Sequence, residues 1–213
     1  KARKFHQWEG GEGKVAGQYL TALYQLAKAA VEKEDYAEAK ELLLRAVGEY
    51  PHNLGEGKLE SGQENNLYYL LGLVQEKLGE AKDAFESLTR ACCGESEPVG
   101  MMYYNDQPPE MIYYQGLAYR MLGEEEQAVR RFQKLVDYGR EHIRDDVKID
   151  YFAVSLPDLL IFEENLNERN RKHCLFMMSL GLKGLGRIDE AEKCAEELLA
   201  MDNAHQEIRV HDL

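Results

Sequence analysis

The sequence contains no run of 18 apolar residues and no apolar leader, so it predicts neither a membrane-spanning helix nor a secretory signal. Positive charge is also scarce. The chain has 26 Lys and Arg against 39 Asp and Glu, which gives a formal net charge of −13. The negative charge is spread along the chain, and phosphates are bound by clustered Lys and Arg, so nucleic acid is not expected as a partner.

Cysteine motifs are missing as well. The four cysteines (Cys92, Cys93, Cys174 and Cys194) form no CxxC pair and have no histidine at metal-ligand spacing. No metal site is predicted, and the histidines are expected to be ordinary structural or surface residues. The pattern favours reduced, mostly buried thiols in a cytoplasmic protein.

The sequence "GEGK" occurs twice, within "GGEGK" at 10–14 and again at 55–58. A phosphate-binding Walker loop needs a further glycine, separated by four residues from the Gly-Lys pair, and Ser or Thr after the lysine. Both segments lack both features, and Val15 and Leu59 follow the lysines. We therefore expect no nucleotide and no other cofactor, and we interpret each segment as the lead-in to a helix.

What the sequence does contain is one spacing that occurs four times. A turn residue is followed five positions later by alanine, then four later by an apolar residue and three later by a small or apolar one. The sets are Glu34, Ala39, Leu43, Ala46; Gly79, Ala84, Leu88, Ala91; Gly123, Ala128, Phe132, Leu135; and Gly186, Ala191, Ala195, Leu198. In each set the alanine five positions after the turn residue is expected to be buried where two helices cross. A bulky side chain there would hold the two backbones apart.

A second stripe, with spacings of three, one and three, precedes each set. Its members are Leu23, Leu26, Ala27, Ala30; Tyr68, Leu71, Gly72, Gln75; Ile112, Gln115, Gly116, Tyr119; and Leu175, Met178, Ser179, Leu182. This spacing places the side chains of a set on one helix face, which we expect to lie in the core. Each unit is therefore predicted to be a pair of antiparallel helices joined by a tight turn.

The two stripes together resemble the tetratricopeptide repeat, best in "YYLLGLVQEKLGEAKDAF" (68–85) and "IYYQGLAYRMLGEEEQAVRRF" (112–132). The resemblance implies an all-α fold, a right-handed α-solenoid of about four helical hairpins in a single domain, 1–213. The expected units are 14–50, 64–95, 109–139 and 171–203, and the expected inserts are 51–63, 96–108 and 140–170. Apolar residues between Phe152 and Phe162 predict an extra helix in the longest insert.

A further resemblance covers nearly the whole chain. "WEGGEGKVAGQY", "NLGEGKL", "MIYYQGLAYRMLG" and "IDYFAVSLPDLLIFEENL" look like the C-terminal region of large bacterial tetratricopeptide proteins. The N-terminal part of those proteins belongs to a family of unknown function, thought to contain a mutarotase-like β-sandwich. The resemblance implies that this chain is a fragment and that its partner is a protein or peptide, foremost the missing N-terminal domain, with carbohydrate as a further candidate.

An aromatic residue follows the leading core position of every first helix, and these four rings are the main binding candidates. They are Tyr24, Tyr69, Tyr113 and Phe176, and Arg120 is the accompanying candidate cation. One interpretation is a ladder of rings in a groove, stacked on a peptide or sugar. The other, which we favour, is packing between neighbouring units, because aromatic side chains bury a large area.

The remaining alternative is an enzyme. The insert contains Asp145, Asp146, Asp150, Asp158 and a Glu pair, Glu163 and Glu164, and paired carboxylates can hydrolyse glycosides. Acidic residues at this density are more often a solvated face, so no catalytic residue is predicted. The sequence favours a non-catalytic interaction or scaffold module that acts in cis with an upstream carbohydrate-related domain. A free-standing peptide adaptor acting in trans, or a part of a glycan-active site, is the alternative.

Overall fold

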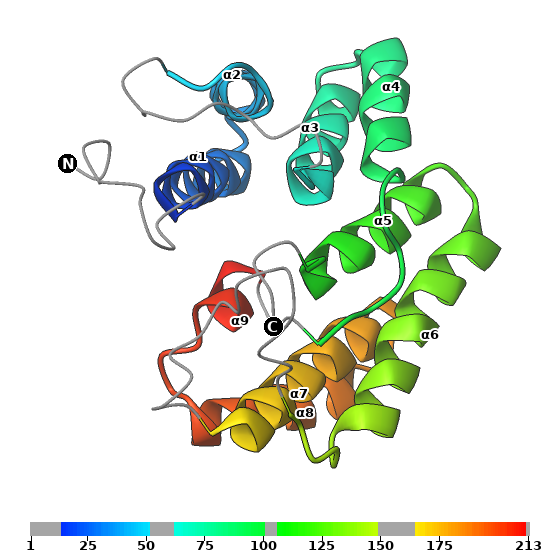
Figure 1. The fold of residues 1–213 in the computed structure, drawn as a ribbon. Helices are drawn as coiled ribbons and strands as arrows, with labels where there is room; N and C mark the ends of the chain where they lie inside the picture. The colour runs from blue at the N-terminus through cyan, green and yellow to red at the C-terminus, as the bar shows by residue number, and fades with distance from the viewer. Residues whose placement is uncertain (1–13, 52–61, 101–105, 149–164, 212–213) are drawn as a thin grey trace. The chain divides into compact units, whose positions relative to one another are not determined.

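The computed structural model describes residues 14–51, 62–100, 106–148 and 165–211. These residues form helices and turns without a strand, so the predicted all-α fold is confirmed for them (Figure 1). The helices are α1 (Lys14–Glu32), α2 (Tyr36–Val47), α3 (Asn65–Lys77), α4 (Ala81–Ala91), α5 (Pro109–Met121), α6 (Glu125–His142), α7 (Leu166–Gly184), α8 (Ile188–Met201) and α9 (Gln206–Val210). None of these helices is both long and apolar enough to cross a membrane.

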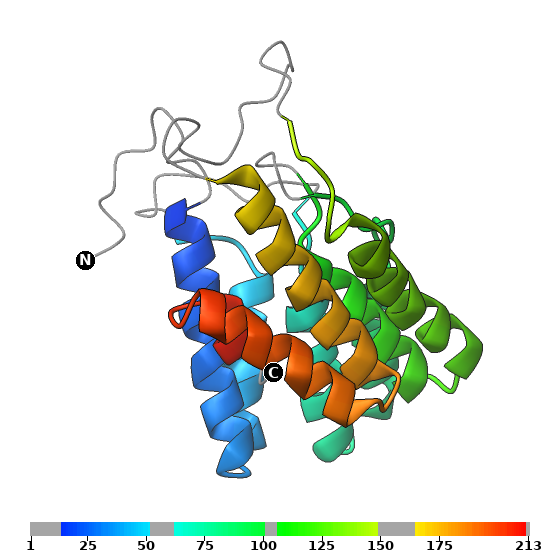
Figure 2. The same ribbon diagram turned by 90° about the horizontal axis from the view of Figure 1, so that it is seen from below.

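The helices belong to two compact units. The N-terminal unit, Lys1–Cys93, contains the hairpins α1–α2 and α3–α4, and α3 packs against α2. The C-terminal unit, Gly94–Leu213, contains the hairpins α5–α6 and α7–α8 together with α9. In that unit α7 packs against α5, α6 and α8. Figure 2 shows α7 and α8 of the C-terminal unit from below.

The same turn joins the two helices of all four hairpins. One residue in each turn has a positive φ: Glu34 (59°), Gly79 (77°), Gly123 (82°) and Gly186 (75°). The N–H of the next residue donates to the carbonyl five positions earlier, 2.9 Å away in each case: Asp35 to Ala30, Glu80 to Gln75, Glu124 to Tyr119 and Arg187 to Leu182. This bond ends the first helix as in a Schellman motif, which normally takes glycine. The first hairpin forms it with a glutamate.

Small residues lie where the helices of a hairpin approach most closely. The four alanines predicted at these crossings are buried, with 0–6% of their surface exposed: Ala39, Ala84, Ala128 and Ala191. On the facing helix, a Cβ added to Gly72 would lie 2.7 Å from Cγ of Leu88, and one added to Gly116 would lie 2.4 Å from Cε1 of Phe132. Since real Cβ atoms do not approach so closely, both positions require glycine at this spacing.

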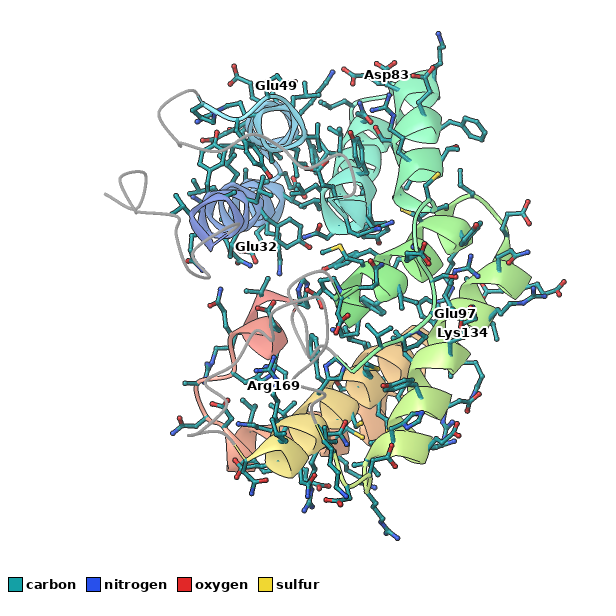
Figure 3. The ribbon with its side chains drawn as sticks, in the orientation of Figure 1. Glu32, Glu49, Asp83, Glu97, Lys134 and Arg169 are labelled. Atoms are coloured by element: carbon teal, nitrogen blue, oxygen red, sulfur yellow. The ribbon has the colours of Figure 1, made fainter. Side chains whose placement is uncertain are left out.

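The C-terminal unit begins with an irregular segment, 94–100, that is tied to three helices. Lys134 on α6 forms an ion pair with Glu97, which Figure 3 shows side by side. The amide of Gln115 on α5 donates to the carbonyl of Glu95 at 2.8 Å, and Nε2 of His173 on α7 lies 2.8 Å from the carbonyl oxygen of Val99. The segment is therefore part of the packed unit.

One predicted core position differs from the structure. Leu26, which the stripe places in the core, is 56% exposed, so that part of the prediction is wrong. The expected extra helix at Phe152–Phe162 and both Gly-Lys segments before Lys14 and at 55–58 lie outside the described residues.

Candidate functional site

Two of the five predicted binding residues lie in the N-terminal unit. Tyr24 on α1 is buried, with 3% of its surface exposed, and Nζ of Lys28 lies 5.8 Å from its ring centroid. Tyr69 on α3 is half-buried. The two rings therefore differ in accessibility, and only Tyr69 offers part of its surface to a ligand in this unit.

The other two candidate rings lie in the C-terminal unit and both are buried. Tyr113 on α5 is 7% exposed, and its ring lies 5.5 Å from that of Tyr114 and 5.7 Å from that of Phe132. Phe176 on α7 is 3% exposed, and its nearest ring is His205, 5.4 Å away. Both side chains have the surroundings of core residues.

Arg120, the candidate cation, joins three elements of the C-terminal unit. Its guanidinium donates to both carboxylate oxygens of Glu125, at 2.7 and 2.9 Å, and to the carbonyl of Gly184 at 2.9 Å. It also lies over the Phe132 ring, 5.0 Å from the centroid. The bonds from Arg120 lower the pKa of Glu125. Arg120 thus connects the α5–α6 turn to the end of α7.

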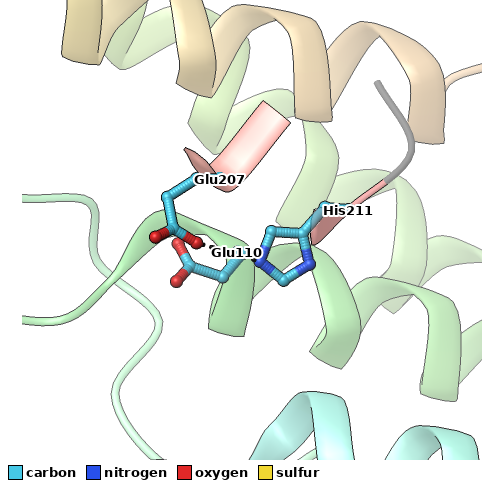
Figure 4. Close-up of side chains that lie close together, drawn as sticks. All are labelled: Glu110, Glu207 and His211. Carbon is cyan, nitrogen blue, oxygen red and sulfur yellow. Dashed lines mark ion pairs between the residues drawn. The ribbon is translucent and has the colours of Figure 1, made fainter. Parts of the chain in front are cut away.

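A cluster that was not predicted lies where α9 packs on the C-terminal unit. We call Glu110, Glu207 and His211 the Glu–Glu–His cluster (Figure 4). Glu110 comes from the first turn of α5, whereas Glu207 and His211 are one turn apart at the end of the described chain. One ligand atom from each residue lies within 4.8 Å of the other two.

Tyr114 supports this cluster from the next turn of α5. Its hydroxyl lies 2.9 Å from Nδ1 of His211, and the two rings meet edge to face at 5.5 Å. The other ring nitrogen, Nε2, lies 3.5 Å from a carboxylate oxygen of Glu207. Tyr114 therefore fixes the ring so that Nε2 points to the carboxylates.

Burial dominates the electrostatics of the cluster. Glu110 and His211 are 8% and 5% exposed, whereas Glu207 is half-buried. Removal from water raises the pKa of Glu110 from 4.5 to about 7; His211 opposes the rise and Glu207 adds to it. Apart from its own backbone N–H, the Glu110 carboxylate accepts no hydrogen bond from the described residues. A buried carboxylate in this state is costly unless a cation neutralises it.

Sequence reasoning missed this cluster because its spacing carries almost no signal. Glu207 and His211 are four apart on one helix, which is common on any surface helix. Glu110 lies 97 residues before Glu207 and follows Pro109 at the start of α5, where an acidic residue has an ordinary explanation. Only the packing of α9 on α5 brings the three together.

The cysteines and the acidic insert show no comparable arrangement within the described residues. None of the four cysteines is in a disulfide; Cys174 is buried, but Cys93 is exposed, contrary to expectation. Burial raises the pKa of the Cys174 thiol to about 12. Of the insert carboxylates, Asp145 contacts Nδ1 of His142 at 2.7 Å and Asp146 accepts from Asn167 at 3.3 Å. The others lie outside the described residues.

The exposed Leu26 on α1 occupies a position that recurs in every hairpin. Its counterparts in the second stripe are buried: Leu71, Gln115 and Met178 are 3%, 0% and 9% exposed. Met178 shows what covers this position, because a Cβ on Gly139 of the preceding helix, α6, would lie 2.5 Å from Cγ of Met178. For Met178 the position is therefore a contact with the preceding hairpin, and no described residue precedes α1 to make an equivalent contact.

Comparison with known proteins agrees with the hairpin architecture. Residues 24–98 match one family model described as tetratricopeptide repeat, and residues 110–138 match a second with the same description. The chain thus contains tetratricopeptide repeats, which generally bind proteins or peptides and are generally not catalytic.

Two solved structures are similar to the chain. One, "Crystal structure of MamA", has 18% identity over 93% of this chain and 97% of the other, with a TM-score of 0.32. Another, "Crystal structure of MamA protein", has 17% identity over 95% of this chain and 92% of the other, with the same TM-score of 0.32.

Proposed function

We propose that this chain is a non-catalytic interaction scaffold that docks in cis, through the face of α1 around Leu26, onto a carbohydrate-related domain that precedes it in the native protein. The exposure of Leu26 carries the proposal, because the same repeat position is buried in the three other hairpins. A repeat array buries its core only by stacking, so an uncovered stacking position favours a further layer.

The expected contribution of this contact is modest for one residue. Full burial of a leucine side chain contributes about 1.5–3 kcal/mol, and Leu26 is already partly covered. Its burial should therefore contribute on the order of 1 kcal/mol, and the rest of the affinity must come from its neighbours on α1. A charge at this position should weaken docking by more than that, because it would be buried without a partner.

The aromatic candidates contribute less to partner binding in this proposal than the face of α1 around Leu26. We propose that Tyr69, the half-buried ring, contacts the bound partner, and that Tyr24, Tyr113 and Phe176 are core rings, each within its own unit. Arg120 fixes the α5–α6 turn against α7 in the C-terminal unit.

The test is a binding measurement between this chain and the separately expressed upstream domain, by calorimetric titration. We expect binding that Leu26→Asp weakens by about tenfold or more, since about 1.4 kcal/mol corresponds to tenfold in affinity. The melting temperature of the free variant should stay close to that of the wild type, because Leu26 is mostly exposed in the free chain.

Leu44→Asp is the matched control, since Leu44 lies on α2 and is 46% exposed. Equal weakening by Leu44→Asp would mean that acidic charge alone is responsible. If the upstream domain does not bind, while a peptide from another protein does and is sensitive to Tyr69→Ala, the cis proposal is wrong and the chain is an adaptor acting in trans.

A further inference from the structure

The Glu–Glu–His cluster combines three features that, together, point to a cation. The first is convergence: Glu110, Glu207 and His211 direct one ligand atom each into a space in which all three lie within 4.8 Å of one another (Figure 4). Two carboxylates and one imidazole are hard and intermediate donors that bind divalent metal ions in proteins.

The second feature is the state of Glu110. Its side chain is more than nine-tenths buried, and Figure 4 shows its carboxylate beside that of Glu207. One of its oxygens lies within 4.8 Å of the ligand atoms of Glu207 and His211, and no described residue other than Glu110 itself donates a hydrogen bond to the carboxylate. A divalent ion between the two carboxylates would be attracted to both, whereas the two carboxylates alone repel each other.

The third feature is the orientation of the histidine. Nδ1 of His211 is engaged by the Tyr114 hydroxyl at 2.9 Å, and Nε2 is the nitrogen on the Glu207 side. With Nδ1–H donating to Tyr114, the lone pair of Nε2 points toward the carboxylates. Histidine ligands are commonly oriented in this way by a hydrogen bond from the other ring nitrogen.

From this geometry we infer that Glu110, Glu207 and His211 bind a divalent transition-metal ion, Zn²⁺ in preference to Mg²⁺ or Ca²⁺. The imidazole ligand favours zinc over the two ions that select oxygen ligands. Three protein ligands leave one position of a tetrahedral ion for water or a further group. The ion clamps α9 onto α5 within the C-terminal unit, so the site is independent of the docking proposed for α1.

The primary experiment titrates the chelator-treated protein with ZnCl₂ by calorimetry and, in parallel, follows its melting temperature. We expect one ion per chain and a melting temperature that rises with the zinc concentration, while MgCl₂ has no effect at the same concentrations. Glu207→Gln should weaken zinc binding by on the order of a hundredfold, because it removes a charged ligand from a half-buried, tolerant position.

Two more variants separate a metal site from a merely structural cluster. Glu110→Gln keeps the shape of the side chain and removes the repelled charge, so the variant should fold and yet lose the zinc response. Tyr114→Phe removes no ligand but releases the ring of His211, and it should weaken binding by about tenfold or more. Glu196→Gln on α8 is the matched control, because this exposed glutamate lies outside the cluster and should leave zinc binding unchanged.

Thiols are the main competing zinc ligands, since Cys93 is exposed and Cys92 lies beside it. Cobalt substitution distinguishes the two sites, because a thiolate-bound Co²⁺ shows an intense charge-transfer band that oxygen and nitrogen ligands do not give. The inference predicts a Co²⁺ spectrum without that band. A strong thiolate band would overturn the inference, because it would place the metal ion at a cysteine. No zinc binding, or equal zinc affinity in Glu207→Gln, Glu110→Gln and the wild type, would also overturn it. Either of these two results would mean that the cluster contains only a Glu207–His211 ion pair.

Discussion

Tyr114 and His211 are 97 positions apart in the chain, yet the Tyr114 hydroxyl lies 2.9 Å from Nδ1 of His211. This contact holds α9 against α5, and Ile208, which is 1% exposed, adds an apolar anchor from α9. The C-terminal unit therefore ends in a helix that is fixed by both polar and apolar contacts.

Glu34 is the one turn residue whose positive φ is not carried by glycine, and its replacement should be favourable. A left-handed conformation costs a residue with a Cβ roughly 1–2 kcal/mol, and replacement by glycine removes this cost. Glycine also has more conformational freedom in the unfolded chain, which reduces the gain in stability by about 0.5–1 kcal/mol. We expect Glu34→Gly to raise the free energy of unfolding by up to about 1 kcal/mol in urea denaturation.

Gly79→Ala, at the equivalent turn, should lower the free energy of unfolding by about 1–2 kcal/mol. Glu41→Gly, in the middle of α2, is the control for glycine in a helix and should lower it by about 1 kcal/mol. A loss of stability in Glu34→Gly would show that the glutamate side chain stabilises the turn by more than its backbone costs.

The helix crossings predict opposite results for one substitution at two sites. A Cβ at Gly116 would collide with the Phe132 ring, whereas a Cβ at Gly17 on α1 would meet no described atom within 4 Å apart from its chain neighbours and its own helix backbone. Gly116→Ala should therefore destabilise the protein by about 1–3 kcal/mol, and Gly17→Ala should stabilise it by about 0.4–1 kcal/mol. Ala84→Leu should resemble Gly116→Ala. Thermal unfolding of the variants measures all of these effects, and equal shifts for both glycines would contradict the crossing geometry.

The two tyrosines proposed for the groove should separate into a core ring and an accessible ring. Tyr113→Ala removes a ring packed on Phe132 and should cost about 3–5 kcal/mol of stability. Tyr69→Ala removes a half-buried ring, so it should cost less and should weaken partner binding by on the order of 1 kcal/mol. Stability and binding to the upstream domain should be measured on the same samples. An unchanged affinity in Tyr69→Ala would remove this residue from the groove.

Half-buried His173 predicts acid sensitivity of the C-terminal unit. Burial lowers the pKa of His173 from 6.5 to about 4; Arg169 and His205 oppose the protonated form, whereas the Val99 carbonyl and Asp106 favour it. A group with a lowered folded pKa contributes stability that is present above pH 6.5 and is lost as the pH falls toward 4. The contribution is at most a few kcal/mol, since one pKa unit corresponds to about 1.4 kcal/mol.

His173→Gln tests this acid sensitivity because glutamine does not titrate and can still donate to the Val99 carbonyl. The free energy of unfolding should fall more steeply in the wild type than in the variant between pH 6.5 and 4. The pKa of Glu110 is raised to about 7, so its contribution to the free energy of unfolding decreases as the pH rises from 4.5 to 7, opposite to that of His173. Both proteins contain Glu110, so the difference in their free energies of unfolding at each pH isolates the effect of His173. Parallel pH profiles would show that His173 is not the sensitive group.

The local architecture was predictable because it depends on residues close in sequence. The spacing of the stripes placed the helix crossings at Ala39, Ala84, Ala128 and Ala191, and all four are buried in the structure. The spacing also placed Glu34 at the turn of the first hairpin, where the other hairpins have glycine. Helix periodicity and turn chemistry both operate within one hairpin. The match to tetratricopeptide models agrees with that prediction.

The candidate sites were less predictable because they depend on what lies beside a helix. Periodicity put Leu26 on the core face, but the equivalent Met178 is covered by the preceding hairpin, which α1 does not have among the described residues. The Glu–Glu–His cluster needs α9 to return to α5, and no local pattern around Glu110 encodes that return. A single sequence contains the ligands, but it does not show which distant residues meet.

The most direct test of the scaffold proposal is the accessibility of the Leu26 position in the native protein. Leu26→Cys should be introduced into this chain and into the full-length protein, and the rate of maleimide labelling should be followed by mass spectrometry. Exposed Cys93 is the internal reference, and it should react equally in both. We predict rapid labelling of the Leu26→Cys position in this chain and labelling slowed by about tenfold or more in the full-length protein, as expected for a covered site. Equal labelling rates in the two proteins would contradict docking through α1.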